Sequence, residues 1–348
     1  MRHEGETAMA QPPSAAEIDF DTPGFRTGHV RLAHSDDRHA FSVIPVPVAV
    51  LAGNRPGPTM FLSGGTHGDE YEGQALLHRL LRETDPAGLS GRLIVMPALN
   101  LPAVRAGRRV SPLDGGNLNR VFPGDPATGP TGAIAAWVAA NVLSRAGFAC
   151  DLHSGGSSGR YLPCAYLHWG GDAAFRRRKI AAARAFGAPF TVIAAGTGAY
   201  GSMTAECDRR GVVMVSAEFG GGASLDLDLK DLAGACLERY LAHAGIRDAG
   251  VAAPAAETRF LRLAGSGSAP MAEVPGLFEP ARRIGETVRT GELAGTIWPV
   301  TALGSAGVDV RFPAGGLLVV ERVRPMVEPG DLLFQLGTEV DPESLMDF

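Results

Sequence analysis

The sequence predicts an α/β protein with a mixed, largely parallel sheet covered by helices on both faces, followed by a small all-β region. Near-continuous apolar runs such as 92–98 are typical of strands buried on both faces. These runs alternate with segments of helical period, which is the order of an α/β sheet. After Gly245 the pattern changes to short strands broken by Gly and Pro, without a convincing helix.

The length of 348 residues favours two domains. We expect a disordered lead-in over 1–18, a catalytic domain over 19–248 and a β domain over 258–348, joined by a linker near 249–257. Two similar phrases at 285–293 and 327–333 are typical of barrel-sandwich domains such as biotinyl and lipoyl carriers. The modifiable lysine of a carrier is absent from the turns, so a swinging-arm role is not expected.

The charge and the apolar segments exclude several classes of partner. The formal net charge of −5 provides no electrostatic footprint for nucleic acid. No signal-peptide core and no apolar span of 18 residues occur, which predicts a cytoplasmic protein that does not enter a membrane. The four cysteines form no CxxC pair, and burial as small apolar residues is expected of Cys150 and Cys164. A homo-oligomer stays open.

The elements follow in order along the chain. Residues 43–51 form a strand in which Pro45 and Pro47 indicate a sheet edge. The stretch 100–120 lacks a sustained period and is expected to be a functional loop. The remaining strands are expected over 60–62, 92–98, 147–152, 161–167, 190–195 and 212–217, and the helices over 75–81, 131–145, 173–186, 203–209 and 228–244.

The first candidate site residues are His67 and Glu70, in the turn between the strand 60–62 and the following helix. An imidazole and a carboxylate three residues apart can converge on one ion, and the glycines around them allow close approach of the backbone. The alternative is a loop histidine beside a glutamate that complements the helix dipole. A metal site needs a third ligand.

His153 is that candidate, because it also follows an apolar strand and precedes two glycines. Active residues of open α/β sheets gather at this edge. Two histidines, one carboxylate and an open position form the ligand set of a catalytic zinc. Asp151 could orient a ligand ring, although a capping or surface role is equally compatible with its position.

Hydrolysis at zinc also needs a carboxylate that is not a ligand, and cations for the oxyanion and for a substrate carboxylate. Glu218 ends a predicted strand before Gly220, Gly221 and Gly222 and fits the first need. The long loop supplies the other groups, with two cations and two neutral donors: Arg109, Arg120, Asn117 and Asn119.

Four motifs in the chain together resemble the succinylglutamate desuccinylase/aspartoacylase family of the zinc carboxypeptidase clan, over roughly residues 40 to 245. They are HGDE at 67–70, RVSPLDGGNLNR at 109–120, DLHSGG at 151–156 and the glutamate at 218. Within the family, the phrases GGTHGDEYEG, GGNLNRVFPG and SAEFGGG are most similar to the branch that deacetylates N-acetyl-2,4-diaminobutyrate in ectoine breakdown.

The resemblance implies a role for each motif residue and one zinc ion per chain. His67, Glu70 and His153 would be zinc ligands, and Glu218 the general base. Arg109 would polarise the scissile carbonyl, and Asn119 with Arg120, next to Asn117, would hold the substrate carboxylate. The substrate implied is a small N-acyl amino acid, and a C-terminal β domain would narrow the entrance of the site.

The substrate branch depends on which charges surround the site. A diacid substrate, as in aspartoacylase or succinylglutamate desuccinylase, needs a second cation, for which Arg160 is the candidate. A diaminobutyrate leaving group carries an amine, which favours an acidic or carbonyl-rich wall. Glu206, Asp208 and Asp226 flank the strand of Glu218 and are candidates for it.

Three other classes of protein compete with a zinc hydrolase. The stretch 196–201 satisfies G-x-G-x-x-G, with Glu218 downstream as a ribose contact, which would suit a dinucleotide-binding oxidoreductase. That motif starts deep in the chain and assigns no role to the strand-end histidines. The stretch 155–159 matches a nucleophile elbow, but a strand-like segment follows where a helix is required. A binding module would be expected to lack one of the metal, base or arginine positions.

Overall fold

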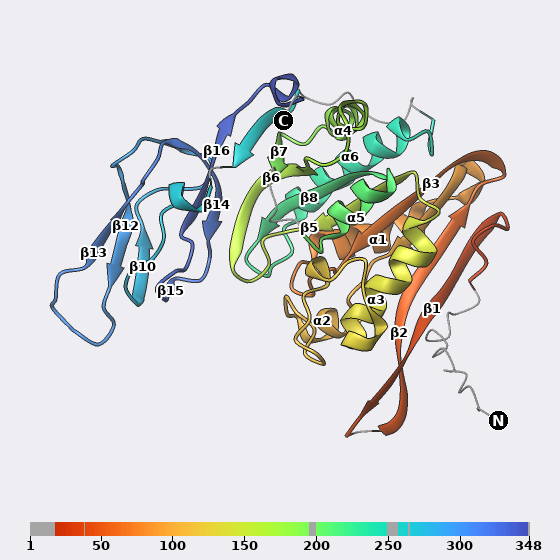
Figure 1. Ribbon diagram of the computed structural model, residues 1–348, viewed down its shortest axis with the longest axis horizontal. Helices are drawn as coiled ribbons and strands as arrows, with labels where there is room; N and C mark the ends of the chain where they lie inside the picture. The colour runs from red at the N-terminus through yellow and green to blue at the C-terminus, as the bar shows by residue number, and fades with distance from the viewer. Residues whose placement is uncertain (1–17, 38, 195–199, 249–256, 264, 347–348) are drawn as a thin grey trace, which may run out of the picture.

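The computed structural model describes residues 18–37, 39–194, 200–248, 257–263 and 265–346. The predicted lead-in and most of the linker lie outside these ranges, as do four of the six residues of the G-x-G-x-x-G stretch. The described chain forms a mixed α/β fold with a large sheet, helices on both of its faces, and C-terminal strands to one side (Figure 1).

The large sheet has twelve strands in the order β1-β2-β4-β3-β5-β8-β6-β7-β9-β16-β14-β11. Its first eight strands along the chain are β1 (Gly24–Asp36), β2 (His39–Ala52), β3 (Arg55–Gly64), β4 (Ser90–Met96), β5 (Phe148–His153), β6 (Gly159–His168), β7 (Phe190–Ala194) and β8 (Val213–Gly221). The others are β9 (Arg259–Leu263), β11 (Thr287–Val288), β14 (Gly316–Arg322) and β16 (Phe334–Glu339).

The expected largely parallel sheet is found only in two stretches. Strands β4, β3, β5 and β8 run parallel to one another, as do β6, β7 and β9. The pairings β1–β2, β2–β4, β6–β8, β9–β16, β16–β14 and β14–β11 are antiparallel. The sheet is therefore mixed. One cause is that β6 follows β5 after a short loop, without a crossover helix, and so pairs antiparallel with β8.

The strand of Pro45 and Pro47, predicted to lie at the sheet edge, is β2, which lies next to the edge strand. The outer strand is β1, which shows no strong apolar run and was not predicted. Pairing of β2 with β4 begins only at Ala49, so at Pro45 and Pro47 the strand has a partner on one side. The missing N–H groups of the prolines are tolerated in that stretch.

Helices cover the two faces of the sheet as expected. One face packs α1 (Glu72–Glu83), α4 (Ala173–Phe186) and α6 (Leu227–His243), and the other packs α2 (Leu101–Ala106), α3 (Pro130–Val138) and α5 (Met203–Arg210). In β3, Met60 and Leu62 face the first group and Phe61 the second, which is the alternation of a strand buried on both faces. A π-helical turn, Ala139–Leu143, extends α3.

Two local expectations differ from the structure. The stretch 100–120 contains α2, which begins with Pro102 in its first turn and ends where Gly107 adopts φ 57°. Glu218 does not end its strand, because β8 continues to Gly221. Cys150 and Cys164 are buried as predicted, and all four cysteines are free.

The C-terminal strands form two groups. Strands β9, β16, β14 and β11 extend the large sheet, and β14 also pairs with β6. A separate four-stranded sheet contains β13 (Val308–Arg311), β12 (Leu293–Trp298), β10 (Gly276–Pro280) and β15 (Met326–Val327). Phe278, Phe312 and Phe334 pack in the core of this region. The domain boundaries and the barrel-sandwich type stay predictions.

The described residues contain no helix with the length and apolarity needed to cross a bilayer.

Candidate active site and metal centre

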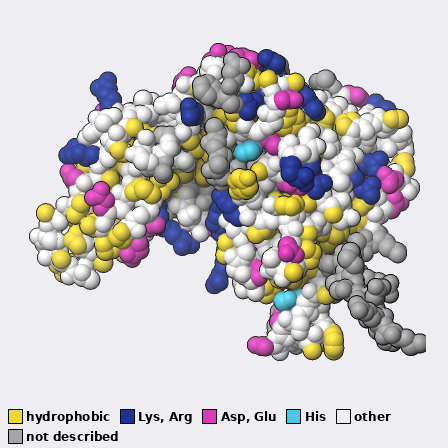
Figure 2. Space-filling view, viewed as in Figure 1, with side chains coloured by type: hydrophobic (Ala, Val, Ile, Leu, Met, Phe, Trp, Pro, Cys, Tyr) yellow, Lys and Arg dark blue, Asp and Glu magenta, His cyan; other side chains and the backbone are white. Residues whose placement is uncertain are grey.

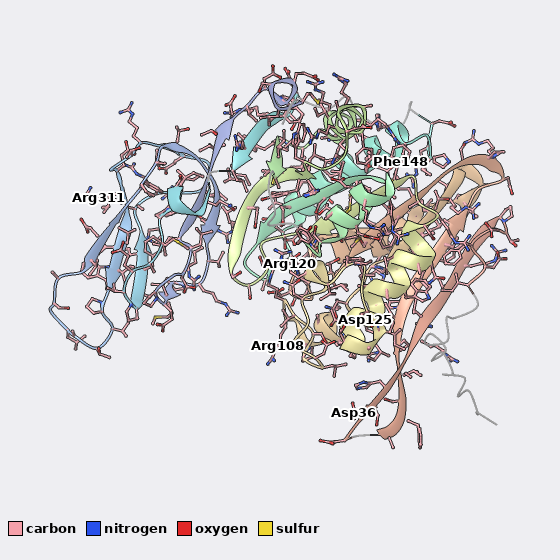
Figure 3. All side chains as sticks on the ribbon, viewed as in Figure 1. Asp36, Arg108, Arg120, Asp125, Phe148 and Arg311 are labelled. Atoms are coloured by element: carbon pink, nitrogen blue, oxygen red, sulfur yellow. The ribbon has the colours of Figure 1, made fainter. Side chains whose placement is uncertain are left out.

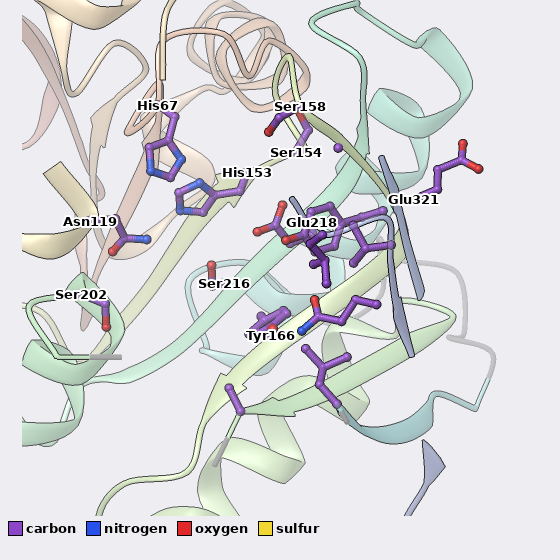
Figure 4. Close-up of a pocket in the computed structure, with 18 of the residues that line it drawn as sticks. His67, Asn119, His153, Ser154, Ser158, Tyr166, Ser202, Ser216, Glu218 and Glu321 are labelled. Carbon is purple, nitrogen blue, oxygen red and sulfur yellow. The ribbon is translucent and has the colours of Figure 1, made fainter. Parts of the chain in front are cut away.

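The predicted ligands come from neighbouring strands of the parallel stretch. His67 and Glu70 follow β3, and His153 is the last residue of β5, which pairs with β3. On its other side β5 pairs with β8, where His153 lies opposite Glu218. Figure 4 shows the two imidazole rings together, with Glu218 facing them across the pocket.

The turn that carries His67 approaches its neighbours too closely for any residue but glycine. A Cβ on Gly68 would lie 2.0 Å from the backbone of Ala103 in α2, and one on Gly73 would lie 2.4 Å from Leu152 Cβ in β5. These two glycines let α2 and α1 pack against the ligand turn and the strand of His153.

The three predicted ligands converge as the sequence suggested. His67 Nδ1 lies 2.8 Å from Glu70 Oε1, and His153 Nδ1 lies 2.7 Å from Glu70 Oε2. All three side chains are buried, and their ligand atoms lie within 4.8 Å of one another. Among the described residues, these three side chains form the one group of histidine, cysteine and acidic residues found that could hold a metal ion.

Each histidine is held from behind through its second nitrogen. His153 Nε2 contacts Asp151 Oδ2 at 2.7 Å, and His67 Nε2 lies 3.1 Å from Asn117 Oδ1. Asp151 is fully buried and also accepts hydrogen bonds from Ser63 and Thr66. Rings fixed in this way present Nδ1 toward one point, which is how metal-binding histidines are usually oriented.

The charges around the cluster favour a cation. Burial by itself would lower the pKa of His153, but the carboxylates of Asp151 and Glu70 outweigh it and raise that pKa well above its usual range. Burial opposes ionisation of Glu70, yet the two histidines lower its pKa. The raised pKa of His153 shows that negative charge dominates around its ring. Two imidazoles and a carboxylate form a donor set that fits a divalent metal such as zinc.

Glu218 differs from Glu70 in having an oxygen without a partner. Its Oε2 is buried and has no hydrogen-bond partner among the described residues. Burial raises its pKa to about 8; His153 and Arg109 lower it, and Glu70 raises it. A carboxylate in this environment can take up a proton readily.

The arginines and asparagines of the long loop take different positions. Arg109 Nη1 lies 3.3 Å from His67 Nδ1 and 3.4 Å from Glu70 Oε1, at the mouth of the cluster. Arg120 is exposed and borders the same cavity, and Figure 3 shows it beside the gap between the main body and the C-terminal strands. Asn119 also lines the cavity, and its Oδ1 accepts from Met203 N at 2.9 Å, which leaves its amide nitrogen free to face the cavity (Figure 4).

Asn117 does not line the cavity with its neighbours. Its Oδ1 contacts the ring of His67 and accepts from Asn119 N at 3.0 Å. In this structure Asn117 contacts the ring of the candidate ligand His67, and its contact with a substrate stays a prediction.

The cavity has a volume of about 800 Å³ and is bordered by both parts of the chain. Figure 2 shows a hollow between the C-terminal strands and the main body. Residues that the sequence did not indicate come from β6 and from the C-terminal strands, and they include Tyr161, Tyr166, His168, Arg262, Leu333 and Phe334. His168 follows the strand 161–167 as His67 and His153 follow theirs, a signal that could have found it. The C-terminal residues carry no local signal.

The charges predicted to select the substrate lie elsewhere. Glu206 binds Arg209 and Arg210, Asp226 caps α6, and Asp208 binds Lys179, so none of the three borders the cavity. Arg160 does not border it either, because its guanidinium contacts Glu321 at 3.1 Å. The expected acidic wall and the expected second cation are therefore not formed by these residues. The nearness of these residues in sequence to Glu218 or His153 did not reveal that each of them contacts a different group.

Two rival interpretations can be compared with the fold. The residues after 155–159 form β6, so the helix that a nucleophile elbow requires is absent there. In the oxidoreductase interpretation Glu218 would contact a ribose. In the structure it lies opposite His153 and borders the cavity. Four of the six residues of the G-x-G-x-x-G stretch lie outside the described residues, so that motif is not compared with the fold.

Two buried histidines and a carboxylate at the carboxyl edge of parallel strands, beside a second glutamate with an unpartnered oxygen, form a group that could hold one metal ion in a hydrolase. Comparison with known proteins agrees. The model of the succinylglutamate desuccinylase/aspartoacylase catalytic domain matches residues 56–244. The chain belongs to the succinylglutamate desuccinylase/aspartoacylase family, as the motifs predicted.

Individual relatives are similar over nearly the whole chain. The N-alpha-acetyl-L-2,4-diaminobutyric acid deacetylase of Halomonas elongata is 32% identical over 329 residues, which cover 94% of this chain and 96% of the relative. The product-bound ectoine utilization protein EutE (DoeB) of Ruegeria pomeroyi has a TM-score of 0.90 and 35% identity, covering 94% of this chain and 99% of that one. A succinylglutamate desuccinylase/aspartoacylase structure from Rhodobacter sphaeroides has a TM-score of 0.87 and 33% identity, with the same coverage.

Proposed function

We propose that the protein is a zinc-dependent deacylase that hydrolyses Nα-acetyl-L-2,4-diaminobutyrate to 2,4-diaminobutyrate and acetate, in the cytoplasm, as a step of ectoine breakdown. The observation that carries the proposal is the convergence of His67, Glu70 and His153 beside the unpartnered oxygen of Glu218. The substrate is supported by the likeness to the Halomonas elongata deacetylase.

The metal would be held by His67 Nδ1, His153 Nδ1 and the carboxylate of Glu70, one ion per chain. The fit rests on the donor set and on the contacts that fix both rings through Nε2. Zinc in such a site lowers the pKa of a water molecule to about 7 and polarises a carbonyl group.

Glu218 would act as general base and then as general acid. It would accept the proton of the attacking water and deliver it to the leaving nitrogen of the amide. Its partly buried position and its lack of a fixed partner support this role, because a carboxylate tied into an ion pair transfers protons less readily. A nearby divalent cation would bring its pKa below the value of about 8 that burial produces here.

The loop residues would orient the substrate and stabilise the charge that develops on it. Arg109, at the mouth of the cluster, would donate to the acyl oxygen as it becomes negative. Arg120 and the amide nitrogen of Asn119 would hold the α-carboxylate. Asn117 would orient His67 instead of binding substrate.

The boundaries of the parts are also a proposal: a lead-in over 1–18, a catalytic domain over 19–248 and a barrel-sandwich β domain over 258–348. The cavity lining supports a role for the C-terminal strands in closing the site, since Leu333 and Phe334 border the cavity that contains Glu218.

The test is metal analysis joined to a panel of three substrates. The purified protein is expected to contain about one zinc per chain. At one pH and one zinc level, kcat/KM should be higher for Nα-acetyl-2,4-diaminobutyrate than for N-acetylaspartate or N-succinylglutamate. Preference for a diacid would contradict the substrate while leaving the zinc deacylase in place. Absence of hydrolysis of all three would contradict the deacylase itself.

A further inference from the structure

One buried polar group beside the cavity has no role in the proposed mechanism. It consists of His168 at the end of β6, Lys179 in α4 and Asp208 in α5. His168 borders the cavity, whereas Lys179 is only 1% exposed and Asp208 is 7% exposed at the side chain. A buried ammonium and carboxylate are costly to desolvate, so their retention behind a cavity residue calls for an explanation.

The hydrogen bonds assign the proton of the imidazole. Asp208 Oδ2 lies 2.7 Å from His168 Nδ1, 2.8 Å from Lys179 Nζ and 3.0 Å from Gly170 N. An ionised carboxylate can only accept, so His168 donates from Nδ1. Lys179 Nζ donates to two further acceptors, the carbonyl oxygens of His168 and Gly170.

The charge within the group is already balanced. The ammonium of Lys179 offsets the carboxylate of Asp208. A neutral imidazole that carries its proton on Nδ1 has a lone pair on Nε2. His168 borders the cavity, and with its proton on Nδ1 it can accept a hydrogen bond at Nε2.

The cavity offers few carboxylates to an amine. Among the described lining residues, the carboxylates belong to Glu218 and Glu321. Glu218 has its proposed role in proton transfer. Glu321 accepts from Arg160 Nη1 at 3.1 Å and from Ile284 N at 3.4 Å, and in Figure 4 its carboxylate points away from Glu218.

The strand pairing gives the position of His168 relative to the reaction centre. Tyr166 lies opposite Ser216 in the antiparallel pair of β6 and β8, and Glu218 is two residues further along β8. His168 lies two residues beyond Tyr166 in the opposite direction, so its Cα is roughly 13 Å along the sheet from that of Glu218. This separation accommodates the two facing side chains and a four-carbon amino acid between them.

We propose that His168, oriented by Asp208 and Lys179, accepts a hydrogen bond from the free amine of the substrate and thereby selects N-acyl diamino acids. The inference rests on the proposed function for the identity of the reacting amide. It explains how an amine is recognised without an acidic wall: the free Nε2 lone pair can accept a hydrogen bond from an ammonium, whereas an ionised carboxylate has no proton to donate to it.

The test compares two substrates that differ only in the amine: Nα-acetyl-2,4-diaminobutyrate and Nα-acetyl-2-aminobutyrate. In the wild-type enzyme kcat/KM should favour the first. His168→Leu should lower the ratio of the two values by roughly 10- to 100-fold, the size expected of a hydrogen bond to a charged group, mainly through KM. His168→Gln, whose amide oxygen can replace the acceptor, should recover most of the ratio.

Controls separate this role from a structural one. His78→Leu changes an exposed histidine of α1 and should leave the ratio unaltered. Zinc content and melting temperature of each variant report on folding. An unaltered ratio in His168→Leu, or a ratio that Glu321→Gln abolishes while His168→Leu keeps it, would overturn the proposal.

Calorimetry of the two deacetylated amino acids distinguishes failure of the inference from failure of the proposed function. If neither acetylated compound is hydrolysed, the proposed function is wrong. Tighter binding of 2,4-diaminobutyrate than of 2-aminobutyrate, lost in His168→Leu, would still support the inference. Equal binding of both amino acids by the wild-type protein would overturn it.

Discussion

Two histidine–carboxylate groups border the same cavity and differ in how their charge is balanced. In the metal centre, Glu70 and Asp151 contact the imidazoles of His67 and His153 without a buried cation. In the second group, Asp208 contacts His168 and the buried ammonium of Lys179. The first is therefore suited to hold a divalent cation, whereas in the second the carboxylate already has an ammonium as its partner. Similar residue types acquire different chemistry according to whether an ammonium is present.

The largest effect should come from removing a ligand of the first group. His153→Ala is expected to lower the zinc content from about one per chain to near zero and to abolish deacetylation, because two ligands do not retain zinc in this kind of site. His168→Leu is the matched variant in the second group and should keep its zinc. Metal analysis after dialysis measures both. Retention of zinc by a folded His153→Ala protein would show that the first group is not the metal centre.

Glu218 tests whether the carboxylate without a partner is the one that moves protons. Glu218→Gln keeps the shape of the side chain but cannot take up a proton, so kcat should fall by about 10²–10⁴-fold with zinc retained. Glu321→Gln is the control, since Glu321 also borders the cavity but is bound to Arg160. Near-normal turnover by the Glu218 variant would assign the proton transfer to another group.

A smaller effect is expected from the residue that orients His153. Asp151→Asn removes the charge 2.7 Å from His153 Nε2 and should weaken zinc binding by about 10- to 100-fold, as other changes behind a metal ligand do. Competition with a chelator measures the affinity. Ser63→Ala removes a hydrogen bond to Asp151 without touching His153 and should change the affinity less. Equal affinities for the wild type and Asp151→Asn would mean that Asp151 only supports the fold.

Much of the metal centre was predictable because its signals are local. His67, Glu70 and His153 stand where apolar strands end and glycines follow, and the structure brings them together. Glu218 was selected in the same way and borders the cavity, although its strand continues to Gly221 and its role as a base stays a prediction. The helix over 173–186 has the predicted bounds, because its apolar period ends at Gly187, which adopts φ 66°.

The sequence by itself determined the α/β class, the helices on both faces, the likeness to a family of deacylases and the three residues that converge at the candidate metal site. Each of these depends on apolar period, turn residues or motifs within short stretches of chain. Only the tertiary structure decided that Asn117 contacts His67, that Asp208 is bound by Lys179, and that the C-terminal strands border the cavity. These outcomes depend on which side chains meet across strands and helices that are far apart in the sequence. The antiparallel return of β6 along β8 is the clearest case, because it brings Tyr166 and His168 to the cavity that Glu218 also borders.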